Sequence, residues 1–74
     1  MRVRVKLFVT LRDGRFEDEV REYASDMTVR LVLEDLNIPE SEVKIVFVNS
    51  RHGMLDQVLN DGDVIGIFPP IGGG

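Results

Sequence analysis

Apolar and polar residues alternate along residues 2–11, RVRVKLFVTL. One face of this segment carries the apolar set Val3, Val5, Leu7, Val9 and Leu11, and the other carries Arg2, Arg4, Lys6, Phe8 and Thr10. A period of two with β-branched residues predicts a half-buried strand. The pair Asp13-Gly14 then predicts a hairpin turn, because glycine adopts positive φ without strain. We expect the return strand within residues 16–23 to be short or bulged, because its apolar residues do not share one parity.

The period changes to that of a helix within residues 25–39, SDMTVRLVLEDLNIP. One helix face is apolar at the spacing i, i+3, i+4 and i+7, with Val29, Val32, Leu33 and Leu36. Thr28 or Asp26 can supply the oxygen that caps the first turn. Pro39 cannot continue the helix, so the helix should end before it.

Two further apolar runs predict strands. Residues 43–49, VKIVFVN, suit a central strand whose Ile45 and Phe47 pack against the helix, and residues 64–68, VIGIF, suit a last strand. Between them we expect a turn at Gly53 and a single helical turn over residues 55–58.

This order of elements predicts an α+β fold in which one main helix packs across a mixed sheet. We expect the first and last strands to lie side by side in the middle of the sheet, as in the β-grasp roll of ubiquitin. With 74 residues, the chain is near the lower size limit for a single core. It is therefore expected to form one domain, residues 1–68, followed by a flexible tail, residues 69–74.

Composition excludes several classes of function. The chain has no cysteine, which excludes disulfides, thiolate metal sites and a cysteine nucleophile. Its net charge of -4 argues against nucleic acid as a partner. Its apolar runs are far shorter than the ~20 residues that span a membrane, and charges interrupt its first nine residues, unlike a signal peptide. We expect a cytoplasmic protein.

The last seven residues, FPPIGGG, combine the stiffest and the most flexible residue types. Pro69 and Pro70 fix φ and remove two N–H donors, so strand pairing must stop there. Glycines have no side chain and can enter a channel only as wide as a backbone. Residues 69–74 reach at most roughly 20 Å when extended. The tail is therefore suited to carrying its carboxylate into the active site of another protein, although terminal glycines are also common in frayed chain ends.

The segment LNDGDVIGIFPPIGGG resembles the C-terminal signature of the MoaD/ThiS sulfur carriers, a ubiquitin-like family that includes the small subunits of molybdopterin synthase. VKLFVTLRD and VFVNSRH resemble the first and third strands of that family, so the resemblance covers nearly the whole chain. It implies that an ATP-using enzyme of the ubiquitin-activating type adenylates the Gly74 carboxylate, which then becomes a thiocarboxylate. Gly73 and Gly72 would provide access. The sulfur would pass to a pterin precursor in the large subunit of molybdopterin synthase.

Such a carrier is not itself an enzyme and is expected to bind no cofactor or metal, because ATP is bound by the activating enzyme. Three alternatives remain open. The chain could be a thiamine-type sulfur carrier, a ubiquitin-like modifier conjugated to proteins through Gly74, or a binding module with an inert tail. The Phe-Pro-Pro ending favours the pterin pathway, because thiamine-type carriers usually lack the double proline.

The partner surface is expected on the open face of the sheet. Phe8 lies on the polar face of the first strand, and Phe68 has opposite parity to the core residues of the last strand. If the two strands are neighbours, both rings lie together as an exposed apolar patch, which is how small domains form docking sites. Pro69, Pro70 and Gly72 would continue the contact. His52 matches a family position on the same surface, and Arg2, Arg4, Lys6 and Arg51 surround it.

Overall fold

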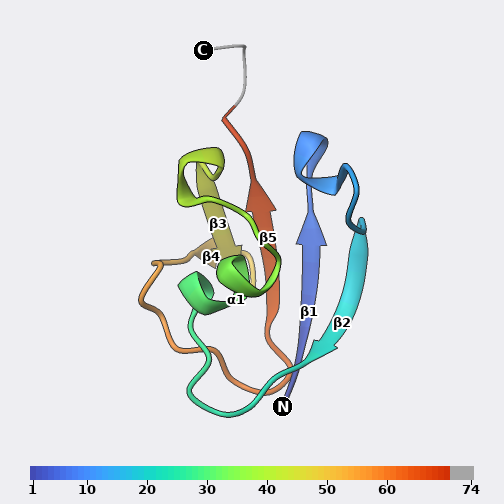
Figure 1. Ribbon diagram of the computed structural model, residues 1–74. Helices are drawn as coiled ribbons and strands as arrows, with labels where there is room; N and C mark the ends of the chain where they lie inside the picture. The colour runs from blue at the N-terminus through green and yellow to red at the C-terminus, as the bar shows by residue number, and fades with distance from the viewer. Residues whose placement is uncertain (71–74) are drawn as a thin grey trace.

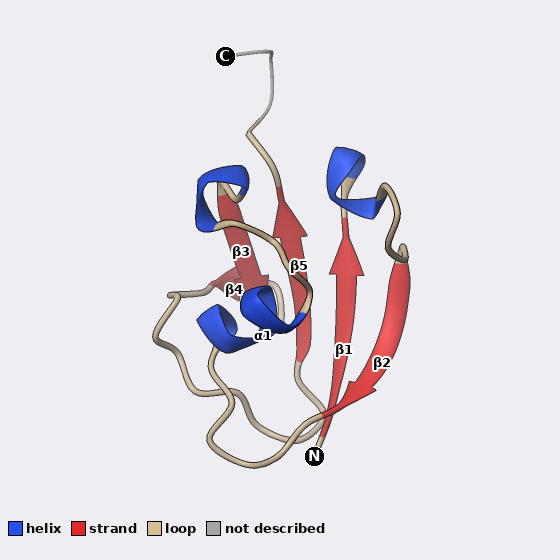
Figure 2. Cartoon of the chain, in the orientation of Figure 1, coloured by secondary structure: helices blue, strands red, loops and turns tan. Residues whose placement is uncertain are grey.

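The computed structural model describes residues 1–70, which form a mixed five-stranded sheet with one α-helix across it. The elements are β1 (Arg2–Leu7), η1 (Val9–Arg12), β2 (Asp18–Glu22), α1 (Val29–Asp35), η2 (Glu40–Glu42), β3 (Ile45–Val48), β4 (Arg51–His52) and β5 (Val64–Phe68), where η denotes a 3-10 helix. The strands are ordered β2-β1-β5-β3-β4, and α1 covers one face (Figure 1 and Figure 2). β1 and β5 are adjacent and parallel, which confirms the predicted β-grasp arrangement.

The centre of the core lies between β1, β5 and α1. Val3, Val5 and Leu7 of β1 are fully buried, and so are Ile65 and Ile67 of β5. The two strands pair residue by residue, so these side chains form one continuous apolar layer beneath the helix. Burial of one such side chain stabilises the fold by roughly 1.5–3 kcal/mol. This layer is therefore the part of the fold that alternation along the chain predicts most directly.

The alternation beyond Leu7 is not a strand. Val9 adopts a φ of +54°, a left-handed conformation that a β-branched residue rarely takes, and the chain turns into η1. Val9, which shares the parity of the buried residues of β1, is 59% exposed, whereas Leu11 reaches the core from η1. The Asp13-Gly14 turn is present, with Gly14 at a φ of +71°. Because β2 begins only at residue 18, however, the connection is longer than a two-residue hairpin.

β2 lies within the predicted range and pairs with β1 over five residues in continuous register. Tyr23 follows it and fastens this edge of the sheet to the helix. The Tyr23 hydroxyl donates a hydrogen bond to Asp35 Oδ2 at 3.0 Å and accepts one from Arg21 Nε at 3.2 Å. Partial burial, together with the hydrogen bond to Asp35, raises the pKa of Tyr23 to about 12.

Helix α1 matches its prediction. The Thr28 side chain caps it by accepting a hydrogen bond from the Leu31 N–H at 3.2 Å. All four predicted apolar positions are buried: Val29, Val32, Leu33 and Leu36. The chain leaves the helix at Asn37, which has a φ of +57°, a conformation that asparagine tolerates better than most residues.

The predicted facing of β3 is wrong. Val46 and Val48 are the buried residues of this strand, whereas Ile45 and Phe47 lie on the opposite face and are half-buried. Both parities of this segment are apolar, and Lys44 shares the parity of the buried pair. Because the charged Lys44 has the same parity as Val46 and Val48, the alternate positions Ile45 and Phe47 resembled the core face.

The segment between β4 and β5 has no helical turn at residues 55–58. It has two hydrogen-bonded turns, from the Gln57 N–H to the Met54 carbonyl at 3.0 Å and from the Asp63 N–H to the Asn60 carbonyl at 3.1 Å. Val58 then forms an isolated antiparallel bridge with Thr28, which fastens the segment to the start of α1. Within residues 1–70, no helix has the length and apolar character needed to cross a membrane.

Candidate functional site

Four rings form a continuous cluster on the face of the sheet that α1 leaves open. Phe8 stacks on Phe68, with 4.1 Å between ring centroids and 7° between ring planes. Phe68 and Phe47 form an edge-to-face pair, with 5.7 Å between ring centroids and 88° between ring planes. Phe47 and His52 form a second such pair, at 5.2 Å and 71°. The three phenylalanines are half-buried and His52 is exposed. We refer to Phe8, Phe47, His52 and Phe68 as the aromatic cluster.

The strand registers bring these four residues together. β1 and β5 pair up to Leu7 and Ile67, and the Phe8 N–H extends the ladder by donating to the Ile67 carbonyl at 3.2 Å. Phe8 therefore lies beside Phe68. β3 runs antiparallel to both β4 and β5, which places Phe47 directly opposite His52 on one side and Gly66 on the other.

The predicted neighbours Phe8 and Phe68 are thus confirmed as neighbours, although neither ring is fully exposed. His52 also lies in the cluster, at its far end. Sequence reasoning missed Phe47, which it had placed in the core. The sequence offered one signal: residues 45–48 are apolar on both faces of the strand, so the face with Ile45 and Phe47 could equally have been the open one.

The basic residues predicted around this surface differ in their pairing. Arg4 donates two hydrogen bonds to the Asp18 carboxylate, at 2.8 and 2.7 Å. These bonds lower the pKa of Asp18 and raise that of Arg4. Arg2 lies 3.6 Å from Glu22. By contrast, Lys6 and Arg51 form no ion pair within residues 1–70. They are the two predicted rim cations still able to pair with a partner protein.

The base of the tail lies at the end of β5, next to the aromatic cluster. The Phe68 carbonyl accepts a hydrogen bond from the Lys44 N–H at 2.8 Å, Pro69 is buried and Pro70 is exposed. The two prolines form part of the wall of a hollow of about 380 Å³ between the two 3-10 helices, which is lined by Thr10, Leu11, Asp13, Arg15, Ser41, Glu42, Pro69 and Pro70. The start of the tail is therefore packed against the domain. Gly72, Gly73 and Gly74 lie outside the described residues.

A buried carboxylate anchors the start of β5, and sequence reasoning did not assign it a role. Asp63 is 8% exposed and accepts hydrogen bonds from Asn49 Nδ2 at 2.8 Å and the Asn60 N–H at 2.7 Å. The Asn49 side-chain oxygen in turn accepts from the Val64 N–H at 2.9 Å. The Asn-Asp-Gly-Asp segment of the motif thus holds the β3–β4 turn and β5 together. Among residues 1–70, no three histidine or acidic side chains gather as metal ligands.

Comparison with known proteins identifies the family. A model of the ThiS family matches residues 5–74, nearly the entire chain. The chain belongs to the ThiS family. The ThiS family consists of small ubiquitin-like sulfur carriers, and the predicted fold and family are both confirmed. Among proteins of curated function, none matches the chain significantly.

Solved structures similar to this ThiS-family chain include proteins of two kinds. A Pyrococcus furiosus protein described as molybdopterin converting factor, subunit 1, is 30% identical, with a TM-score of 0.75 over 96% of this chain and 99% of that one. One chain in a solved Helicobacter pylori complex of subunits 1 and 2 of molybdopterin-converting factor is 26% identical to this chain. Its TM-score is 0.66, and the match covers 100% of this chain and 100% of that one. Small archaeal modifier protein 1 of Haloferax volcanii is 20% identical, with a TM-score of 0.76 over 95% of this chain and 98% of that one, and shares the fold.

Proposed function

We propose that this ThiS-family chain is a sulfur carrier of molybdenum- or tungsten-pterin cofactor synthesis, activated at the carboxylate of Gly74. The observation that carries the proposal is the position of the aromatic cluster at the base of the tail. Phe8 stacks on Phe68, and the next residue, Pro69, is buried. A protein that binds these rings therefore receives the tail at a defined position. The two relatives described as molybdopterin converting factor subunit 1 support the choice of pathway.

The proposed chemistry needs a partner enzyme at each step. A free carboxylate is a poor electrophile, because its charge repels nucleophiles and oxide is a poor leaving group. The activating enzyme joins the Gly74 carboxylate to the α-phosphate of ATP and releases pyrophosphate. Hydrosulfide, delivered by the sulfur donor, then attacks the acyl carbon, forms the C–S bond and releases AMP, which leaves a thiocarboxylate. The carrier contributes the carboxylate and the side-chain-free approach through Gly72 and Gly73.

The reach of the tail sets a limit on where the acceptor's active site can lie. Because Pro69 is buried, the reach of the tail is counted from Pro70. Five residues span at most about 17 Å. The site that takes the sulfur should therefore lie within that distance of the docked Phe68 end of the sheet.

The proposed acceptor is the large subunit of molybdopterin synthase, and the proposed activator is an adenylating enzyme of the ubiquitin-activating type. The docking surface is the aromatic cluster, continued by Pro70. An apolar centre surrounded by charged residues is the usual composition of a protein interface. Lys6 and Arg51 would form part of that rim.

Mass spectrometry of the purified carrier tests the proposal. Incubation with its activating enzyme, ATP and a sulfur donor should replace one oxygen by sulfur in the wild type, but not in a variant lacking Gly74. Transfer of that sulfur to a pterin in the presence of the large subunit would support the pterin pathway, and transfer to a thiazole precursor would support the thiamine alternative. Covalent adducts on lysines of other proteins would support the modifier alternative. Full cellular activity without Gly73 and Gly74 would overturn the proposal.

A further inference from the structure

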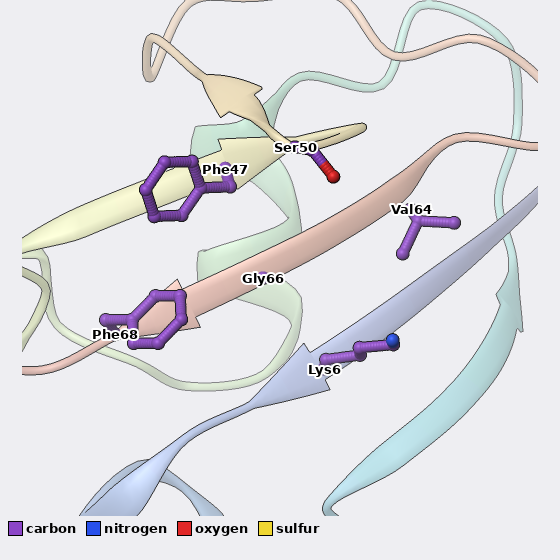
Figure 3. A pocket seen from close by; sticks show the side chains of 6 residues that line it. All are labelled: Lys6, Phe47, Ser50, Val64, Gly66 and Phe68. Atoms are coloured by element: carbon purple, nitrogen blue, oxygen red, sulfur yellow. The ribbon is translucent and has the colours of Figure 1, made fainter.

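The open face of the sheet contains a hollow of about 340 Å³ beside the aromatic cluster (Figure 3). It is lined by Lys6, Phe47, Ser50, Val64, Gly66 and Phe68. Figure 3 shows that these side chains come from β1, β3, β5 and the β3–β4 turn, on the side of the sheet away from α1. The volume is near the lower limit of ~300 Å³ for pockets that hold a whole small molecule. A hollow of this size also accommodates a side chain of a partner protein.

Gly66 creates this hollow. In the strand registers it lies directly between Phe47 on β3 and Lys6 on β1, and Val64 and Phe68 flank it along β5. A side chain at position 66 would occupy the middle of that frame. A Cβ there would lie 3.3 Å from Phe8 Cε2 and 3.6 Å from Phe68 Cε1.

The backbone does not require a glycine at this position. The positive φ values among the described glycines are at Gly14 and Gly62, so Gly66 has a conformation open to other residues. A glycine inside a central strand weakens the strand and often marks a place where another group approaches closely. The space above Gly66 is therefore suited to a group from outside the domain.

Lys6 adds a charge to one wall of the hollow. Its register partner on β2 is Asp18, but both oxygens of that carboxylate accept hydrogen bonds from Arg4. Lys6 is half-buried and forms no ion pair within residues 1–70. The hollow thus combines aromatic and aliphatic walls with one cation that an acidic group from a partner can neutralise.

We propose that this hollow is a specificity pocket for one aliphatic side chain of the acceptor protein, with a neighbouring acidic residue of the acceptor paired to Lys6. This inference rests on the proposed function, and the occupant belongs to the protein that takes the sulfur. The solved complex of subunits 1 and 2 from Helicobacter pylori supports an acceptor subunit as that protein. Aliphatic side chains fit against ring faces, and anchors of this kind, surrounded by contacts that exclude water, dominate interface energetics.

Two variants test the pocket and its charge separately. Gly66→Val fills the hollow with a residue favoured in strands, and Lys6→Glu reverses the charge. Lys44→Glu is the matched control, because Lys44 is the only other lysine and does not line the hollow above Gly66. Binding to the purified large subunit from the same organism should weaken about tenfold or more for Gly66→Val and Lys6→Glu. It should change less than about twofold for Lys44→Glu.

Thiocarboxylate formation by the activating enzyme is the second readout, and it should remain within about twofold of the wild type in Lys44→Glu. If folded Gly66→Val binds the large subunit normally, the pocket proposal is wrong although the proposed function stands. If Gly66→Val does not fold, Gly66→Ala replaces it with the same expectations. Failure of the wild type to load sulfur or to bind the large subunit would instead count against the proposed function.

Discussion

The rings of Phe8 and Phe68 lie face to face, and Arg12 extends over the Phe8 ring at 5.8 Å from its centroid. The two phenylalanines come from opposite ends of the chain, and the parallel pairing of β1 with β5 brings them together. Each ring covers part of the other, so they form one surface rather than two separate contacts. A partner that recognises this surface recognises a feature present only in the folded domain.

Phe8→Ala should therefore weaken binding to the large subunit while the domain stays folded. Truncation of an aromatic anchor typically costs about 2 kcal/mol or more, which is more than tenfold in affinity. Titration calorimetry measures the loss. Phe16→Ala is the control, because Phe16 is also half-buried but lies under Arg21. Normal affinity of the folded fraction together with a collapsed melting temperature would identify Phe8 as a core residue instead.

Leu7→Ala should destabilise the domain far more than Arg4→Ala. Leu7 is fully buried, and removal of a buried leucine side chain costs about 2–5 kcal/mol. Arg4 pairs with Asp18 in solvent, and exposed ion pairs contribute little to stability. Urea unfolding of both variants measures the difference. Equal shifts in the unfolding midpoint would contradict the observed facing of β1.

Val9→Gly should stabilise the domain. Val9 has a φ of +54° and is 59% exposed, so the substitution relieves strain and removes little packing. A non-glycine residue in this region costs of order 1–3 kcal/mol, partly offset by the greater freedom of glycine in the unfolded chain. We expect a net gain of about 1 kcal/mol in the free energy of unfolding.

Val20→Gly is the matched control for this gain, because Val20 is a similarly exposed valine within β2. Glycine in a strand interior should lower the melting temperature there. If both substitutions lower the melting temperature by the same amount, the strain at Val9 is absent in solution.

Tyr23 should make stability fall at high pH. Its pKa is raised to about 12 in the folded protein by burial and by the hydrogen bond to Asp35. In the unfolded chain a tyrosine ionises near pH 10. The stabilisation is therefore complete below pH 10 and is lost as the pH rises to about 12, because the unfolded state releases the proton first.

Denaturant unfolding of the wild type and of Tyr23→Phe between pH 10 and about 12 isolates the contribution of Tyr23. The two lysines titrate in both proteins, so their contribution cancels in the difference between the two free energies of unfolding. Tyr23 is the only tyrosine, so ultraviolet absorbance follows its ionisation directly. Parallel stability curves for the two proteins, or an absorbance midpoint near 10, would contradict the prediction.

The elements with one covered face could be predicted from the sequence. β1 shows clean alternation because solvent lies on one side and α1 on the other, and the helix shows its period for the same reason. That alternation also located Phe8 and Phe68 as outward-facing rings. β3 could not be assigned in this way, because Val46 and Val48 are buried on one face and the rings of Phe68 and His52 pack against Phe47 on the other. With both faces apolar, the period of two disappears.

Other parts of the site depend on three-dimensional detail. Val9 continues the alternation of β1 perfectly, so only the backbone conformation reveals the end of the strand. The hollow above Gly66 depends on two strand registers and on the ring positions. Asp63 matched a motif, but its burial and its hydrogen bonds depend on the distant Asn49. The roles of Gly72, Gly73 and Gly74 rest on the sequence.

The central place of β5 also determines how the domain responds to mechanical load. A pull on the tail along the strand axis reaches β5 at Phe68, where the strand is hydrogen-bonded to β1 on one side and to β3 on the other. Such a force shears both ladders at once, so their hydrogen bonds share the load instead of breaking one after another. An edge strand has only one ladder to resist extraction. The strand that leads to Gly74, the proposed reactive end, is thus the one held on both sides, and a tail drawn tightly into a narrow channel need not unravel the domain behind it.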